Sequence, residues 1–162
     1  MSSGARKRDN PQIIPILAHE SVYIGVDVGK HIHVAGFVSN TLMDRHKQFE
    51  ACPVLKFENS REGFRQLVDR IQSYVPVEQC FVLLEKTGHY HKALEQYLLE
   101  LDIAVYLIHV QERPKGTVKT DKRDALGLAN HLYNQLEKGI QVADKLQLIR
   151  RAVAHCICQS KS

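Results

Sequence analysis

The short connection between two apolar segments near residue 30 limits the folds of this chain more than any other feature of its sequence. Residues 22–28 and 32–38 are apolar and rich in residues that favour β-strands, and only a few residues separate them. Parallel neighbours need a crossover of a dozen or more residues, so a connection this short joins antiparallel strands. The sequence therefore predicts a β-hairpin, with a weaker third strand at residues 54–57.

Helical and strand patterns alternate after this hairpin. Ser60 is a candidate N-cap for an amphipathic helix that ends before Pro76. A strand at residues 80–84, a helix capped by Thr87 and a strand at residues 103–108 follow, and these lengths indicate a right-handed parallel crossover unit. The apolar stripes of the two helices are Phe64, Leu67, Val68 and Ile71, and Tyr90, Leu94, Tyr97, Leu98 and Leu101.

Two more helices are predicted toward the end of the chain. Thr120 caps the first, and the second begins near Ala143 and carries an unpaired apolar stripe. The stripes are Ala125, Leu128, Ala129, Leu132 and Leu136, and then Leu146, Ile149, Val153 and Cys156. Because an unpaired stripe favours self-association, we expect a homodimer or higher oligomer through residues 143–158. Together the elements predict an α/β fold, a mixed sheet flanked by helices.

Composition excludes several classes of protein. No apolar run approaches the roughly 20 residues that cross a bilayer, and the basic N-terminus lacks the apolar core of a secretory signal. The cysteines at positions 52, 80, 156 and 158 have no disulfide-framework spacing, so we expect reduced thiols in a cytoplasmic protein. The net charge of +4 permits a polyanionic partner without requiring one.

Four carboxylates stand at the ends of separate predicted elements. Asp27 and Glu85 each end an apolar strand, and Asp121 and Asp124 share one side of the first turn of a helix. Burying a carboxylate costs several kcal/mol unless it is paired, hydrogen-bonded or metal-bound. Each has a simpler explanation alone, such as the favourable N-terminus of a helix for the two aspartates. Gathered at one edge of a sheet, they predict a Mg²⁺ site, with Mn²⁺ as the alternative, that acts on phosphodiesters.

Basic residues accompany these carboxylates. The basic segment 113–123 is interrupted by Pro114 and Gly116, which favours a loop over a helix face. Composition alone favours a solvated loop, whereas the neighbouring carboxylates favour the binding of backbone phosphates. The candidate nucleic-acid-binding residues are Lys30, Arg113, Lys115, Lys119, Lys122 and Arg123.

Three motifs around the carboxylates resemble those of the DEDD transposases, a family that includes insertion-sequence transposases guided by a bridge RNA and pilin-gene invertases. The motifs are YIGVDVGK at residues 23–30, LEKTGHY at 84–90 and KTDKRDA at 119–125. The segment NSREGF at 59–64 is similar to a further family segment. The third motif is the most specific, because many ribonuclease H-like proteins share the strand with its aspartate.

This resemblance implies a ribonuclease H-like (RuvC-like) fold and a Mg²⁺-dependent enzyme that cleaves and transfers DNA strands in transposition or site-specific recombination. It implies that Asp27, Glu85, Asp121 and Asp124 are catalytic and bind the metal, with DNA as partner and a guide RNA as a further one. In the family, a helical connection and a serine-bearing domain follow. We therefore expect a basic arm at 1–20, a RuvC-like domain at 21–136, and a connection at 137–162 that ends before the serine domain, leaving the fragment inactive alone.

Other functions stay open at this point. A nucleic-acid-binding module without activity would use the basic residues, but a binding groove gains nothing from buried like charges. A stand-alone ribonuclease H-like nuclease or junction resolvase would use the same carboxylates and no second domain. The histidine pairs at 31–33 and 89–91, with the cysteine pair at 156–158, lack conventional zinc spacing. His31 and His33 are instead expected on a polar strand face.

Overall fold

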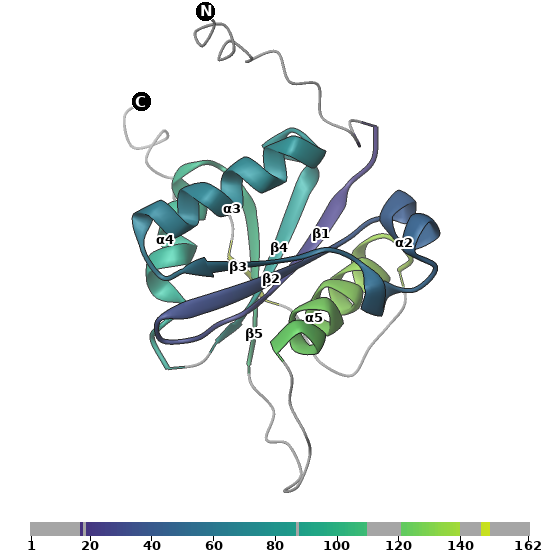
Figure 1. Cartoon of the computed structure of the whole chain (residues 1–162). Helices are drawn as coiled ribbons and strands as arrows, with labels where there is room; N and C mark the ends of the chain where they lie inside the picture. Colours follow the sequence, from purple (N-terminus) through teal and green to yellow (C-terminus); the bar gives the residue numbers. More distant parts are fainter. Residues whose placement is uncertain (1–16, 18, 87, 110–120, 140–146, 150–162) are drawn as a thin grey trace, which may run out of the picture.

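The computed structural model of the chain describes residues 17, 19–86, 88–109, 121–139 and 147–149, and at 109, 121–124 and 147–149 it describes the backbone alone (Figure 1). The strands are β1 (Val22–Asp27), β2 (Ile32–Val38), β3 (Val54–Glu58), β4 (Cys80–Lys86), β5 (Ala104–His109) and β6 (Gln147–Ile149). The helices are α2 (Asn40–His46), α3 (Arg61–Tyr74), α4 (Lys92–Glu100) and α5 (Asp121–Leu136), with short 3₁₀ helices η2 (Phe49–Ala51) and η3 (Val77–Gln79).

The described strands form one mixed sheet in the order β3-β2-β1-β4-β5-β6. β1 pairs antiparallel with β2, and β2 pairs antiparallel with β3. β4 lies parallel to β1 on its other side, and β5 lies parallel to β4. The predicted hairpin, third strand and parallel crossover are confirmed, and with them the ribonuclease H-like α/β fold class.

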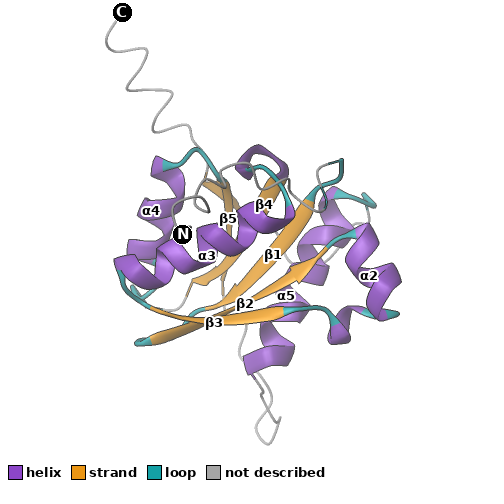
Figure 2. Cartoon of the chain, turned by 45° about the horizontal axis from the view of Figure 1, so that its top comes forward, coloured by secondary structure: helices purple, strands orange, loops and turns teal. Residues whose placement is uncertain are grey.

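Helices cover both faces of this sheet. Helices α3 and α4 lie on one face and α5 lies on the other (Figures 1 and 2). All six residues of β1 are buried, as expected of a central strand covered on both sides. Ile24 pairs in register with Phe37 and Val82, and the ring of Phe37 packs against Tyr74 of α3. These side chains build the core on the α3 face.

Helix α5 runs antiparallel to β1. At the start of β1, the hydroxyl of Tyr23 donates a 2.7 Å hydrogen bond to Glu137, and its ring meets Tyr133 edge-on at 5.7 Å. Two residues further along β1, Gly25 lies against the backbone of Ala125 and Ala129. The beginning of α5 therefore lies toward the end of β1, where Asp27 stands.

The N-termini of three helices show which helix starts can be predicted from a local capping residue. Ser60 caps α3 as predicted, because its hydroxyl accepts a 3.2 Å hydrogen bond from the amide of Gly63. Ser39 caps α2 in the same way, through a 3.0 Å bond from the amide of Leu42, but no prediction was made for this short helix. Helix α4 begins at Lys92, later than a cap at position 87 implies, and Thr87 lies outside the described residues.

The predicted final helix is wrong at residues 147–149. These residues form β6, which pairs antiparallel with β5 through Leu107 and Gln147 and through Val105 and Ile149. The physical reason is the edge of β5, whose unpaired amides and carbonyls accept a further strand. Ile149, one of the four members of the stripe behind the expected dimer through residues 143–158, lies in β6, and the dimer itself stays a prediction. Leu146, Val153 and Cys156, the other members of that stripe, lie outside the described residues.

Two further features concern the cysteines and the apolar character of the helices. Cys52 and Cys80 are buried, and neither of them is part of a disulfide. Within the described ranges, no helix is both long enough and apolar enough to span a membrane.

Candidate metal centre

Asp27 and Glu85 stand side by side on adjacent parallel strands. The register pairs Val26 of β1 with Leu84 of β4, so the next residue of each strand is a carboxylate. Neighbouring strands lie about 4.7–4.9 Å apart, and residues in register point to the same face. Both residues are buried, with 6% of Asp27 and 8% of Glu85 exposed. The strand register therefore places Asp27 and Glu85 next to each other at the same end of the sheet.

These two carboxylates belong to the face that α5 covers. A β-carbon placed on Gly25 would fall 2.6 Å from the Cβ of Leu128 in α5 and closer still to the helix backbone. Alternate residues of a strand share a face, so Asp27, two residues beyond Gly25, belongs to the same side. Glu85 follows by register.

The first turn of α5 lies at the level of Asp27. Asp121 begins the helix, about one turn or 5.4 Å before Ala125, which contacts Gly25. Asp27 lies about 6.6 Å beyond Gly25 along β1, in the direction from which α5 enters. The backbone of residues 121–124 is therefore near the strand end that carries Asp27 and Glu85. The side chains of Asp121 and Asp124 lie outside the description.

Two glycines allow α5 to lie directly on the strands. Gly25 and Gly36 pair in register across β1 and β2. A β-carbon on Gly36 would fall 2.7 Å from the Leu126 side chain and 2.9 Å from its amide nitrogen. Sequence reasoning missed both residues. The available signal was a glycine inside each of two apolar strands, which often marks the close approach of another backbone.

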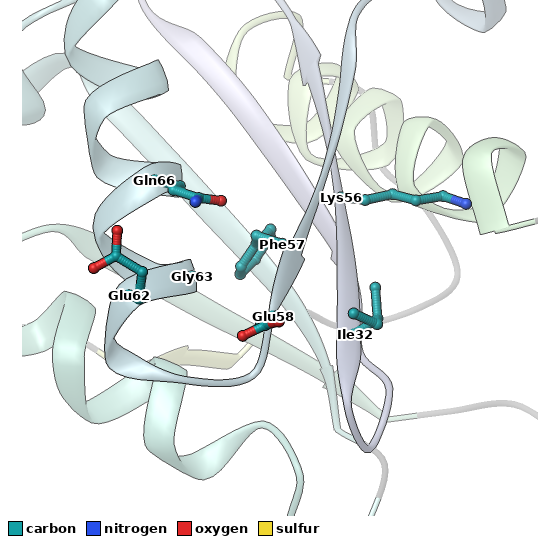
Figure 3. A pocket seen from close by; sticks show the side chains of 7 residues that line it. All are labelled: Ile32, Lys56, Phe57, Glu58, Glu62, Gly63 and Gln66. Carbon is teal, nitrogen blue, oxygen red and sulfur yellow. The ribbon is translucent and has the colours of Figure 1, made fainter.

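Basic side chains border the carboxylates. Lys30 is exposed in the turn that follows β1. Lys56, which sequence reasoning missed, pairs in register with Val34, and Val34 pairs with Asp27, so all three share the α5 face. Lys56 is exposed and extends away from α3 toward α5 (Figure 3). Arg113, Lys115 and Lys119 lie outside the described residues, and Lys122 and Arg123 are described by their backbone alone.

The expected polar strand face is wrong for His33. His31 is exposed, but His33 is fully buried, with its ring 5.3 Å from that of Phe57 and 6.3 Å from that of Phe64. The pairing of His33 with Phe57 directs both side chains to the α3 face. His33 is buried because its face of β2 packs against Phe64 of α3, whereas Ile32, at the start of the strand, is 47% exposed.

A surface pocket of about 540 Å³ lies elsewhere. It opens between α3 and the edge strand β3 and contains neither Asp27 nor Glu85 (Figure 3). Its lining is Ile32, Lys56, Phe57, Glu58, Glu62, Gly63 and Gln66. Among side chains that the structure describes, no group of three or more His, Cys, Asp or Glu residues could hold a metal ion.

The family model described as transposase, for DEDD proteins of the IS110 type, matches residues 24–159. The chain belongs to this DEDD transposase family. Its members process DNA, so the transposase domain described above has DNA as its partner and, in general terms, uses a divalent metal. A comparison with curated proteins gave no match.

Proposed function

We propose that this transposase domain cleaves and transfers DNA strands at a Mg²⁺ site formed by Asp27, Glu85, Asp121 and Asp124. The strongest support for this proposal is the register of β1 and β4, which brings two buried carboxylates next to each other at the end of the sheet. The entry of α5 at that strand end supplies the second pair of candidates.

The donor set fits a hard divalent cation. Two adjacent buried carboxylates repel each other, and a cation held by Asp27 and Glu85 would offset this repulsion. Carboxylate oxygens are the ligands that Mg²⁺ prefers, and Mn²⁺ accepts the same ligands. When bound, one or two such ions activate a nucleophile and stabilise the leaving oxygen of a phosphodiester. The chain itself contributes the fixed strand ends that hold the carboxylates in register.

Lysines near the carboxylates are suited to hold the DNA backbone. Lys30 is exposed in the turn that follows β1, and Lys56 is exposed on β3, where it pairs with Val34, the β2 partner of Asp27. We assign phosphate contacts to both, together with the basic residues between Arg113 and Arg123. Phosphate contacts of this kind position DNA without reading its sequence.

Metal titration by calorimetry tests the carboxylate assignment on the full chain. We expect Mg²⁺ and Mn²⁺ to bind the wild type, and Asp27→Asn, Glu85→Gln, Asp121→Asn and Asp124→Asn each to weaken binding at least about tenfold. Asp69→Asn is the matched control, because Asp69 is an exposed aspartate on α3. Unchanged affinity in Glu85→Gln, or no binding by a folded wild type, would refute the site.

Fluorescence anisotropy with duplex DNA tests the lysines. Lys30→Gln and Lys56→Gln should each weaken binding and reduce the slope of log K against log salt by about one. Arg45→Gln, an exposed position on α2, should leave the slope unchanged. A hairpin RNA in the same assay tests the guide-RNA hypothesis. Equal slopes for all three variants would remove Lys30 and Lys56 from the interface.

A further inference from the structure

The turn that follows Asp27 is closed by a buried imidazole. The amide of Gly29 donates a 3.1 Å hydrogen bond to Nδ1 of His33. Gly29 has no room for a side chain, because a β-carbon there would collide with the carbonyl oxygen of Ile32. The turn is therefore tight, and His33 supplies the acceptor for one of its amides.

Asn59 holds the same turn from its other side. Its backbone amide donates a 2.8 Å hydrogen bond to the carbonyl of His31, and its side-chain amide donates a 3.1 Å bond to the carbonyl of Lys30. Asn59 itself stands between β3 and the Ser60 cap of α3, so it is fixed at both ends. Two separate elements thus determine the path of three consecutive turn residues.

The imidazole is held in one chemical state. Nδ1 accepts a hydrogen bond, so the ring is neutral and carries its proton on Nε2. Burial between Phe57 and Phe64 favours the same state, because it lowers the pKa of His33, an effect that the Asn59 side chain partly offsets.

We infer that His33 and Asn59 are positioning residues for the carboxylate site, holding the turn that fixes the end of β1 and presents Lys30. This inference rests on the proposed function, because the turn can position a metal ligand only if Asp27 is one. Val28 alone separates Asp27 from Gly29, so a change in the path of the turn moves the carboxylate relative to Glu85. Groups that hydrogen-bond a metal ligand change metal affinity by about 10–100-fold when removed, and we expect the low end of this range for a turn that begins two residues after the carboxylate.

Two substitutions at position 33 separate positioning from packing. His33→Phe keeps an aromatic ring between Phe57 and Phe64 but removes the acceptor for Gly29. His33→Asn removes the ring but keeps an acceptor oxygen where Nδ1 stands. His31→Phe is the control, because the side chain of His31 is exposed in the same turn. Each variant is measured at a temperature where circular dichroism shows it folded.

The readouts are Mn²⁺ affinity and the hydrogen-exchange rate of the Gly29 amide. Positioning predicts that His33→Phe and Asn59→Ala bind Mn²⁺ about tenfold more weakly and exchange faster, whereas His33→Asn stays within about twofold of wild type. Wild-type affinity in His33→Phe together with weak binding in His33→Asn would overturn the inference, because packing would then be the role of His33. If the wild type binds no metal, the proposed function fails. If the Gly29 amide exchanges at the wild-type rate in His33→Phe, His33 does not stabilise the turn, and the inference fails independently of metal binding.

Discussion

At the scale of single residues, the buried side chain of His33 makes the free energy of unfolding depend on pH. Burial lowers the pKa of His33 below its ordinary value of 6.5, so the unfolded chain binds a proton more readily than the folded one. Stability therefore rises with pH where the unfolded state holds more protons, and it falls as the pH drops below about 6.5. A single such group changes the free energy of unfolding by up to about 1.4 kcal/mol per pH unit.

The expected result is a free energy of unfolding that declines between pH 6.5 and pH 5 more steeply in the wild type than in His33→Phe. Urea denaturation at several pH values measures this difference. His31→Phe, at an exposed position, should keep the wild-type slope. His91 is also buried with a lowered pKa, caused by burial and then by Lys86, so part of the slope remains in every variant. Identical slopes in wild type and His33→Phe would contradict the prediction.

Sequence and structure agree best on residues that violate a local pattern. Asp27 and Glu85 could be singled out from sequence because a carboxylate in an apolar strand needs a partner. Lys56 could not, because its place in line with Asp27, across Val34 of β2, depends on the register of three strands. The burial of His33 could not be predicted either, because the sequence alternation around it does not show which face of β2 the helix α3 covers.

At the scale of elements, the hairpin, α3 and the parallel crossover were predictable because each carries its own local signal of turn, cap or periodicity. β6 was not, because Ile149 fits the predicted helical stripe and only pairing with the edge of β5 makes residues 147–149 a strand. The placement of α5 was also beyond the sequence. Its apolar face could be predicted, but not the two glycines on which it lies.

Substitution of these glycines tests how strictly the sheet fixes α5. Gly36→Ala should lower the free energy of unfolding by about 1–3 kcal/mol, because the new methyl group overlaps Leu126 and the helix backbone. Gly25→Ala should cost more, because it meets only backbone and the Cβ of Leu128. Gly127→Ala is the control within α5: nothing lies within 4 Å of its added carbon, and alanine should stabilise the helix by about 0.5–1 kcal/mol. Thermal unfolding measures all three, and an unchanged Tm in Gly25→Ala would show that α5 can shift without cost.

At the scale of the whole molecule, the fold brings distant parts of the chain to one end of the sheet. The strand order places β1 and β4 side by side although more than 50 residues separate Asp27 from Glu85. Helix α5 then returns across β1 and β2, anchored at its far end by the Tyr23–Glu137 hydrogen bond. A cation bound at this end would join β1, β4 and α5, so its binding should stabilise the entire domain rather than one loop.

This coupling predicts that Mg²⁺ raises the Tm of the full chain. For a dissociation constant of about 1 mM, 10 mM Mg²⁺ adds about 1.4 kcal/mol to the free energy of unfolding. In a domain of this size, that corresponds to a Tm increase of about 3–5 °C. Glu85→Gln should lose the increase, and without metal it should be at least as stable as the wild type, because the repulsion between adjacent carboxylates is removed. Asp69→Asn should keep the full increase. An equal response to Mg²⁺ in Glu85→Gln would mean that the stabilising cation binds outside the β1–β4 strand ends, and the shared position of Asp27 and Glu85 would then need a role without metal.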